Sequence, residues 1–430
     1  MVLLFLLAAV STAAATTPPL WPLPTHSSFE PSAALPVTFN LLKFKLLGTD
    51  ASAPLPSPLA AACTRYSAII LGVPVANRTT LTAPNTLAVE FDIADIAAPL
   101  SPGATDHNES YGIGLAAASQ SMRITAASQW GALRALETLA QLTKRGSAAG
   151  SFTLPGGALH VDDAPRFGWR GLMIDTGRNY LTTTTIKMAL DAMAYCKLNV
   201  LHWHITDDQS FPLLVPTPPS LATLADGGAF SPKHVYTLDD VSAIMAYARA
   251  RGIAVLPEFD MPGHSTSWTN GNPALRSRCS GGSGHENGGF SRPLDPTSNA
   301  TYALIDMLLA TVDPFFSSEF PFWHLGGDEV EFGCWQHSEG GYIDAWMAAN
   351  GIAKGDYPAL QEYFEQRVIA TVRSLPSKKR TILWEDNSPG HTSGLCVVAR
   401  LAASVRSMRA LPSPPATPPS PSQSGQKTPW

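Results

Sequence analysis

The sequence predicts an α/β protein in which a small α+β domain precedes a parallel sheet of the (β/α)8 barrel type. The first observation is length, because 430 residues that are 45% hydrophobic can bury the cores of two domains. The second is a change of pattern near Arg166, after which apolar strands alternate with helical stretches. The third is that these strands are apolar throughout, as in parallel sheets that helices cover on their faces.

The N-terminal α+β domain is expected over residues 17–164, a region rich in Ala, Pro and Thr. It contains short β-like pieces such as "LAVEFDIA". Its last part, "MRITAASQWGALRALETLAQLTK", predicts a strand, a turn and an amphipathic helix. The helix is indicated by four leucines at helical spacing: Leu133, Leu136, Leu139 and Leu142.

The (β/α) region is expected over residues 165–395. Five predicted strands are "GLMIDTGR", "VLHWHI", "IAVLPEFD", "FWHLGGDE" and "TILWED". The predicted helices between them are "TTTIKMALDAMAYCKL", "LDDVSAIMAYARARG", "TYALIDMLLATV" and "ALQEYFEQRVIATVRSL". No glycine-rich fingerprint follows the first strand and the sequence holds no Walker motif, which disfavours nucleotide binding. Residues 396–430 are Pro/Ser-rich and are expected to be disordered.

Composition and targeting signals narrow the class of protein. A net charge of −5 and the lack of a long Lys/Arg run argue against a nucleic-acid partner. Residues 1–16 form a short apolar run followed by small residues, which predicts a secretory signal peptide. That run is too short to span a bilayer, and no other stretch is apolar enough to do so. Three sequons are then candidate glycosylation sites: Asn77, Asn108 and Asn299.

The cysteines are scattered, so neither a zinc ribbon nor a disulfide-dense scaffold is indicated. At most two bridges can form among the five, with one thiol left over. They are Cys63, Cys196, Cys279, Cys334 and Cys396.

Polar residues follow each predicted strand, and in a (β/α) barrel the carboxyl ends of the strands carry the chemistry. One strand that ends in an acid is ordinary, whereas five that end in Arg, His, Trp and carboxylates predict a shared pocket. Asp208 or Glu385 alone could simply solvate a loop. The set is Arg178, His202, His204, Asp207, Asp208, Glu258, Asp260, His264, Asp328, Glu329, Trp384, Glu385 and Asp386.

Two interpretations of this pocket compete. In the first it binds a metal ion, because His202 and His204 lie two apart on a strand, face the same side and have carboxylates near. Against this, no H-E-x-x-H or related zinc signature is present. In the second it cleaves a glycoside: one carboxylic acid protonates the glycosidic oxygen while a second group stabilises positive charge at the anomeric carbon. Three tryptophans suit the apolar face of a pyranose: Trp203, Trp323 and Trp384.

Four long motifs give a specific resemblance. "GLMIDTGRNY", "LNVLHWHITDDQSFP", "VLPEFDMPGHSTSW" and "HLGGDEVEFGCW" resemble, in order, the β-N-acetylhexosaminidases of glycoside hydrolase family 20. The likeness runs from the N-terminal domain, through "ALRALETLAQL" and "DAPRFGWRG", to about Asn387. It implies an exo-acting, retaining and substrate-assisted hydrolase, with no cofactor, in which the 2-acetamido oxygen of the substrate attacks the anomeric carbon.

The resemblance also implies roles for individual residues. Glu329 is the expected general acid and later base, and Asp328 the group that holds the acetamido N–H. His264, with Asp207 behind it, is expected to form a hydrogen-bonded chain to Glu329. Arg178 is expected to bind the ring hydroxyls of the terminal sugar and Trp384 to wall the pocket. A family disulfide beside the site matches Cys279 and Cys334, whereas Cys63 lacks the partner that the family has.

The sequence departs from the family after Asn387, because a full barrel needs eight strands and five are predicted here. We therefore expect a truncated or mis-spliced gene product with two exposed strand edges, poor solubility and little activity. Two hypotheses follow: an exo-β-N-acetylhexosaminidase acting on N-acetylglucosamine- or N-acetylgalactosamine-terminated oligosaccharides or glycoconjugates, or a non-catalytic fragment that at best binds sugar. The expected location is the secretory pathway, leading to a lysosome, a vacuole or the outside of the cell. A homodimer is compatible with the sequence.

Overall fold

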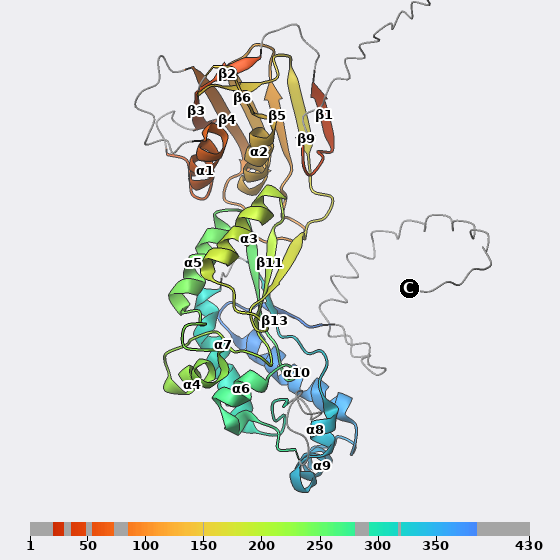
Figure 1. Ribbon diagram of the computed structural model, residues 1–430. Helices are drawn as coiled ribbons and strands as arrows, with labels where there is room; N and C mark the ends of the chain where they lie inside the picture. Colours follow the sequence, from red (N-terminus) through yellow and green to blue (C-terminus); the bar gives the residue numbers. More distant parts are fainter. Residues whose placement is uncertain are drawn as a thin grey trace, which may run out of the picture.

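The computed structural model describes residues 20–29, 36–48, 54–72, 85–148, 150–279, 292–316 and 320–384. The described chain forms an N-terminal α+β part followed by a parallel sheet covered by helices (Figure 1). The predicted signal peptide, the sequon at Asn77 and the tail over 396–430 lie outside the described residues.

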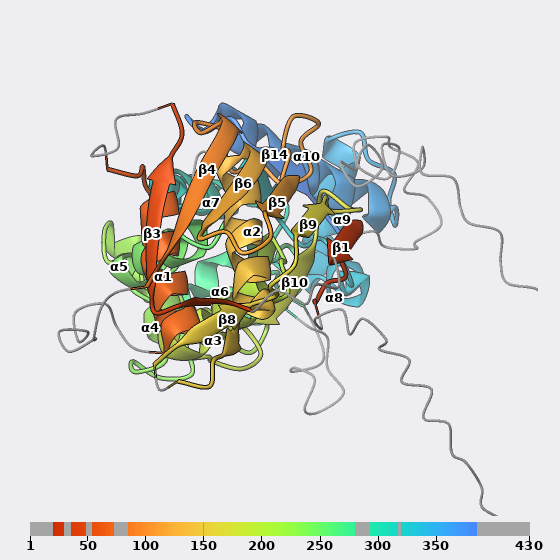
Figure 2. The same cartoon turned by 90° about the horizontal axis from the view of Figure 1, so that it is seen from above.

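The N-terminal part is built on a six-stranded mixed sheet with strand order β1-β9-β5-β6-β4-β3 (Figure 2). Its strands are β1 (His26–Phe29), β3 (Leu41–Leu46), β4 (Thr86–Asp95), β5 (Tyr111–Leu115), β6 (Ser121–Ser128) and β9 (Leu159–Asp163). A smaller sheet contains β2 (Val37–Phe39), β7 (Lys144–Arg145) and β8 (Phe152–Leu154). Two helices belong to this part, α1 (Leu59–Leu71) and α2 (Gln129–Leu142).

Helix α2 follows β6 directly, without the turn that the sequence predicts. The extended Ser128 ends the strand and caps the helix, because its side chain accepts the N–H of Gly131. The four leucines at helical spacing are buried, as their spacing predicts.

The five predicted parallel strands are confirmed. They pair in chain order as β10 (Gly171–Asp175), β11 (Val200–Thr206), β12 (Ala254–Phe259), β13 (Phe322–His324) and β14 (Arg380–Ile382). In the part of the chain that the structure describes, β10 and β14 therefore each pair on one side only. Two apolar side chains of β10 are correspondingly exposed, Leu172 to 41% and Met173 to 45%.

The four predicted helices of this region are present as α3 (Thr183–Tyr195), α5 (Leu238–Arg249), α7 (Asn299–Val312) and α10 (Tyr357–Ser374). Four more helices were not predicted: α4 (Pro219–Gly228), α6 (Thr266–Gly271), α8 (Phe332–Gln336) and α9 (Tyr342–Ala349). They have 5 to 10 residues, too few for an apolar periodicity to stand out. Within the described ranges, 3-10 turns occupy Pro273–Leu275, Asp313–Phe315 and Glu339–Gly341.

The two faces of the parallel sheet have different compositions because side chains alternate along each strand. One face packs against the helices in a large apolar core that includes Leu201, Trp203 and Trp323. The other face is apolar at its amino end and polar at its carboxyl end. The apolar end packs into the core of the N-terminal part through Val200, Ala254, Leu256 and Phe322.

The two parts are also joined by buried polar contacts. Glu109, which is 1% exposed, accepts hydrogen bonds from Arg134 on α2, and from Arg170 and Asn199, which precede β10 and β11. Arg134 in turn donates to the backbone oxygens of Arg251 and Gly252. The N-terminal part therefore closes the amino end of the sheet and leaves its carboxyl end to form a site.

Two further predictions concern membranes and glycosylation. Within the described ranges no helix combines the length and the apolar character needed to cross a bilayer. Asn299 is exposed at the start of α7, where its side chain accepts a hydrogen bond from Arg367. Asn108 is exposed just before β5, where its side chain accepts the N–H of Ser110. Glycosylation of either remains a prediction.

Candidate active site

The register of the sheet places four polar residues side by side at its carboxyl end. Asp175 is paired with His204, His204 with Glu258, and Glu258 with His324. Each comes from a different strand, from β10 to β13. Glu258 and His324 lie one pleat above Leu256 and Phe322, two apolar residues that meet the N-terminal part. Strand pairing alone therefore gathers a histidine–carboxylate layer at the end where barrels carry their chemistry.

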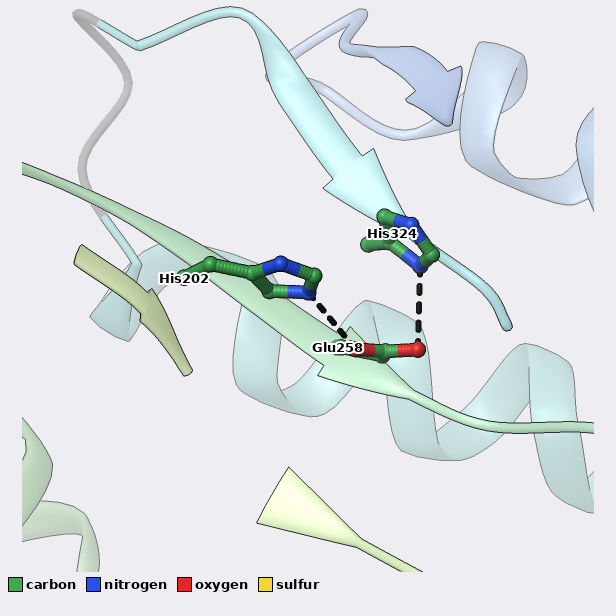
Figure 3. A group of neighbouring side chains, drawn as sticks. All are labelled: His202, Glu258 and His324. Carbon is green, nitrogen blue, oxygen red and sulfur yellow. Dashed lines mark hydrogen bonds and ion pairs between the residues drawn. The ribbon is translucent and has the colours of Figure 1, made fainter. Parts of the chain in front are cut away.

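Glu258 is the centre of this layer. Its side chain is 0% exposed, and each oxygen has two partners. His202 Nε2 and His204 Nδ1 lie 2.6 and 2.9 Å from Oε2, while Trp384 Nε1 donates to Oε1 at 2.8 Å. His324 Nδ1 lies 3.1 Å from Oε1 and also receives the N–H of Gly326. Figure 3 shows His202 and His324 each directed at a different oxygen of Glu258.

A chain of polar contacts runs from this layer to the paired acids. His204 Nε2 lies 3.0 Å from Asp207 Oδ2. His264 Nδ1 lies 3.4 Å from Asp207 Oδ1, and the opposite ring nitrogen, Nε2, lies 3.5 Å from Glu329 Oε2 and 3.8 Å from Asp328 Oδ2. The structure thus brings together four of the predicted site residues: Asp207, His264, Asp328 and Glu329.

Arg178 joins the same group from the end of β10. Its guanidinium donates to Asp175 Oδ2 at 2.7 Å and lies 2.8 Å from Asp207 Oδ2. The side chain is 43% exposed, so part of its donor set faces solvent. Arg178 therefore supports Asp207 and presents cationic donors at the rim of the site.

Burial and charge set the protonation of these groups. Burial alone would lower the pKa of His264, but its hydrogen bond to Asp207 and the charges of Asp260 and Asp328 raise it to about 9. The pKa of Asp207 is lowered, because its contacts with His204 and His264 outweigh burial. The pKa of Asp328 is raised, chiefly by burial. At neutral pH a protonated His264 therefore lies between the Asp207 carboxylate and the paired acids.

The loops that carry the acids have unusual backbone conformations. His264 has a φ of 46° and Glu329 a φ of 51°, in the left-handed region that non-glycine residues seldom adopt. Gly326 and Gly327, which precede the acids, have φ values of 70° and 96°. Such conformations cluster at sites where the surrounding structure holds them in place. Here the N–H of Gly327 is bound by the buried Asp260 carboxylate at 3.1 Å.

Replacement of Gly326 by alanine should displace this loop. A Cβ at Gly326 would lie 1.6 Å from Asp260 Oδ1, so either the loop or Asp260 must move. We expect Gly326→Ala to lower the thermal midpoint and to reduce any turnover at least about 100-fold, the typical cost of a 1 Å misplacement. Circular dichroism and glycoside hydrolysis measure the two effects.

Gly340→Ala is the matched control for Gly326→Ala. Gly340 has a φ of 62°, yet no atom lies within 4 Å of a Cβ built there. It therefore carries the left-handed strain, about 1–2 kcal/mol for an L-residue, without the clash. Equal losses of activity in the two variants would contradict the role assigned to the Gly326–Asp260 contact.

The two acids have different surroundings although they are neighbours in sequence. The Glu329 side chain is 78% exposed, whereas that of Asp328 is 29% exposed. Asp328 Oδ1 and His264 Nε2 are both buried atoms that lack a hydrogen-bond partner among the described residues. Buried polar atoms normally have partners, so these two mark a place where a polar ligand group would be accommodated.

A disulfide joins Cys279 to Cys334, the pair that the family resemblance implies. Cys334 lies on α8, which begins three residues after Glu329. Trp335 on the same helix donates its indole N–H to Ser277 at 3.1 Å. Both contacts tie the segment that follows the acids to the loop at 277–279. Cys63 is a free, buried thiol whose pKa burial raises to about 12.

The prediction that Trp203 and Trp323 suit the face of a pyranose was wrong. Both are 0% exposed and lie in the core between the sheet and the helices. Each occupies the strand position next to an inward-facing histidine, so strand alternation turns it away from the site. Trp384 differs, because it is 36% exposed and its ring lies 4.6 Å from that of His324.

The same side chains include the groups that could hold a metal ion. In each group the ligand atoms lie within 4.8 Å of one another, and at least one ion pair joins two members of each group. The groups are His202–Glu258–His324, His204–Glu258–Asp260, Asp207–Asp260–His264 and His264–Asp328–Glu329. The expectation that the pocket takes a sugar rather than a metal ion remains a prediction.

Several residues of the site were not singled out from the sequence. His324 ends β13 and contacts Glu258, and Asp175 ends β10 and binds Arg178. Their position in the sequence could have identified them as site residues, because both are the last residues of apolar strands. The Gly326–Gly327 pair was visible but unassigned, since its use depends on the buried Asp260.

Comparisons with known proteins agree on one family. A family model described as "Glycosyl hydrolase family 20, catalytic domain" matches residues 167–405. A second, described as "beta-acetyl hexosaminidase like", matches residues 20–142.

Relatives and solved structures point the same way. The chain is 42% identical over 263 residues to mouse "Beta-hexosaminidase subunit beta", covering 61% of this chain and 46% of the relative. The cat subunit beta is 36% identical over 397 residues, covering 90% and 71%. The structure is similar to a Flavobacterium johnsoniae chitobiase, with 26% identity and a TM-score of 0.65, covering 85% of this chain and 52% of that one. It is also similar to a Vibrio harveyi exo β-N-acetylglucosaminidase, with 25% identity and a TM-score of 0.68, covering 87% and 56%. The aligned region thus spans about half the length of the mouse relative and of both structures.

Proposed function

Since the chain belongs to glycosyl hydrolase family 20, we propose that it acts as an exo-β-N-acetylhexosaminidase. The substrate is a terminal, non-reducing N-acetylglucosamine or N-acetylgalactosamine of an oligosaccharide or glycoconjugate. The reaction retains the anomeric configuration, and the acetamido group of the substrate is the nucleophile. Mouse and cat relatives are named as β-hexosaminidase subunits, which supports the reaction class. They do not favour the non-catalytic alternative.

One observation supports this proposal most: a buried carboxylate oxygen without a partner lies beside an exposed acid. Asp328 Oδ1 has no hydrogen-bond donor among the described residues. An acetamido N–H supplies the donor that such an acceptor needs. Glu329, the next residue, is open to solvent and can reach an oxygen on the leaving-group side.

In the proposed reaction each side chain either transfers a proton or stabilises a charge. Glu329 protonates the glycosidic oxygen while the acetamido oxygen attacks the anomeric carbon, which forms an oxazolinium ion. Asp328 accepts the acetamido N–H and stabilises the positive charge. Glu329, now a carboxylate, takes a proton from a water molecule. This water attacks the anomeric carbon and opens the oxazolinium ring. His264, held protonated by Asp207, faces Glu329 and stabilises its anionic form.

Two further contacts complete the proposed pocket. Arg178 binds hydroxyls of the terminal sugar through the donors that Asp175 and Asp207 leave free. Trp384 forms a wall against the sugar ring. Both side chains are partly exposed at the carboxyl end of the sheet, which supports these assignments.

Because the proposed nucleophile belongs to the substrate, we expect a sharp preference between substrates. The protein should release 4-nitrophenol from the N-acetyl-β-glucosaminide but not from the β-glucoside, because the glucoside lacks the acetamido group. The 2-amino-2-deoxy-β-glucoside is the matched control, since it keeps the nitrogen and lacks the acetyl oxygen. Similar kcat/KM values for all three would exclude substrate assistance.

The destination and assembly follow as parts of the same proposal. We place the protein in the secretory pathway, with delivery to a lysosome, a vacuole or the exterior, where sequons such as Asn299 are glycosylated. A homodimer is the proposed assembly. Deglycosylation followed by mass spectrometry tests the first part, and light scattering tests the second.

A further inference from the structure

Glu258 is a fully buried carboxylate that touches neither the paired acids nor solvent. A buried charge is costly unless it is paired and hydrogen-bonded, and an apolar residue would fill a purely structural position at lower cost. Partners from three other parts of the chain converge on it: β11, β13 and the segment after β14. The roles proposed for Glu329 and Asp328 do not explain why a carboxylate is buried at position 258.

The two oxygens of Glu258 serve different parts of the site. Oε1 accepts the indole N–H of Trp384 at 2.8 Å, which fixes the ring that borders the pocket. Oε2 lies 2.9 Å from His204 Nδ1, and the other nitrogen of that ring lies 3.0 Å from Asp207. Asp207 then continues the chain to His264 and Glu329.

We propose that Glu258 is a positioning residue, whose single carboxylate keeps the sugar-facing Trp384 in register with the chain that orients Glu329. The inference rests on the proposed hydrolase function. Because Trp384 and His204 share one rigid carboxylate, a shift of either is transmitted to the other. The sugar wall and the acid are then held at a fixed separation, as attack by the acetamido group demands.

The protonation of His204 supports this arrangement. Burial alone would lower its pKa, but hydrogen bonds to Asp207 and Glu258 and the charge of Asp260 raise it to about 10. His204 is therefore an imidazolium that donates to Asp207 on one side and to Glu258 on the other. Around Glu258 itself the facing titratable groups are His202, His204, His324 and Asp260. Its own pKa is held low, because the histidine contacts outweigh burial.

A double-mutant cycle tests the coupling in the full chain. Glu258→Gln should lower kcat about 10- to 100-fold, because the chain to Glu329 loses its anchor. Trp384→Phe keeps the aromatic wall but removes the N–H, and should raise KM several-fold. Glu258→Leu removes both acceptor oxygens, and in that background Trp384→Phe should have almost no further effect relative to Glu258→Leu alone. Additive effects of the two changes would overturn the proposal.

Glu137→Gln is the matched control for a buried glutamate. Glu137 is 6% exposed in the N-terminal part, where it accepts hydrogen bonds from Tyr66 and Gln141. We expect its kcat and KM to match those of the wild type. If Glu137→Gln lowered kcat as much as Glu258→Gln, loss of stability rather than positioning would explain both.

Histidine NMR tests the same network without turnover. In the ¹⁵N-histidine-labelled wild type, His204 should keep both ring protons up to about pH 10. In Glu258→Gln it should lose one at clearly lower pH, because removing an anion destabilises the imidazolium. His204→Gln assigns the resonance. A His204 titration unchanged in Glu258→Gln would overturn the proposal. If the wild type failed to cleave the N-acetylglucosaminide while this shift was present, the hydrolase proposal alone would fail.

Discussion

Glu329→Gln is expected to abolish most hydrolysis of substrates with poor leaving groups. Glutamine cannot protonate the glycosidic oxygen, and general acid catalysis typically contributes about 10²- to 10⁴-fold. A 2,4-dinitrophenyl N-acetylglucosaminide needs no such proton, so its bond cleavage should slow much less than that of a β-linked disaccharide. The measurement is kcat/KM across a series of aryl glycosides, plotted against the pKa of the leaving phenol. The slope should steepen in the variant.

Asp328→Asn should behave differently although it changes the adjacent residue. Its carboxylate stabilises the oxazolinium ion that every substrate must form, so good and poor leaving groups should slow by a similar factor. Glu331→Gln, an exposed change two residues after Glu329, serves as the control and should leave the slope unaltered. If both acid variants gave the same dependence on leaving group, the roles assigned to Asp328 and Glu329 would be wrong.

The strands were predictable because burial on both faces leaves a plain signal. Each of the five reads as a short apolar run that ends in polar residues, and each is present in the sheet. The short helices α6 and α8 were not predictable, because six and five residues carry too little periodicity. The N-terminal sheet was only partly predictable, since its order places β5 between β6 and β9 through contacts between distant segments.

The site was predictable as a set of residues but not as a geometry. The motifs identified Asp207, His264, Asp328 and Glu329, and the structure brings them into one chain of contacts. The central place of Glu258 depends on register, because two strands must align before His204 and His324 can flank it. Register is set by tertiary packing, which a single sequence does not encode locally. The error on Trp203 has the same origin, since the face toward which a buried strand residue points depends on that packing.

The amino end of the sheet supports the site from below. The inward face changes from Leu256 to Glu258 within one pleat, so the apolar contact with the N-terminal part lies directly beneath the histidine–carboxylate layer. Loss of that contact would free the strands that carry the layer. Glu109 is a buried polar group at this junction that binds three partners, and its replacement gives the largest stability effect that we expect outside the site.

Glu109→Gln is expected to destabilise the protein by about 3–5 kcal/mol, the usual cost of breaking a buried ion pair on one side. Arg134 and Arg170 lie 2.7 and 2.5 Å from its two oxygens, and Asn199 donates to the same carboxylate at 2.9 Å. An amide leaves both guanidinium groups without a buried counter-charge. Urea unfolding followed by circular dichroism measures the loss.

The pH dependence of that loss separates the ion pair from simple packing. Burial alone would raise the pKa of Glu109, but Arg134 and Arg170 lower it to about 2. An unfolded glutamate titrates near about 4.3, so the stabilisation is present above that pH and fades as pH falls toward 2. The wild type and Glu109→Gln should therefore differ at pH 7 and converge in acid. Asp92→Asn, which breaks the exposed pair with Arg123, should change the midpoint little at either pH. A difference for Glu109→Gln that stayed constant down to pH 3 would show that packing, not charge, holds the two parts together.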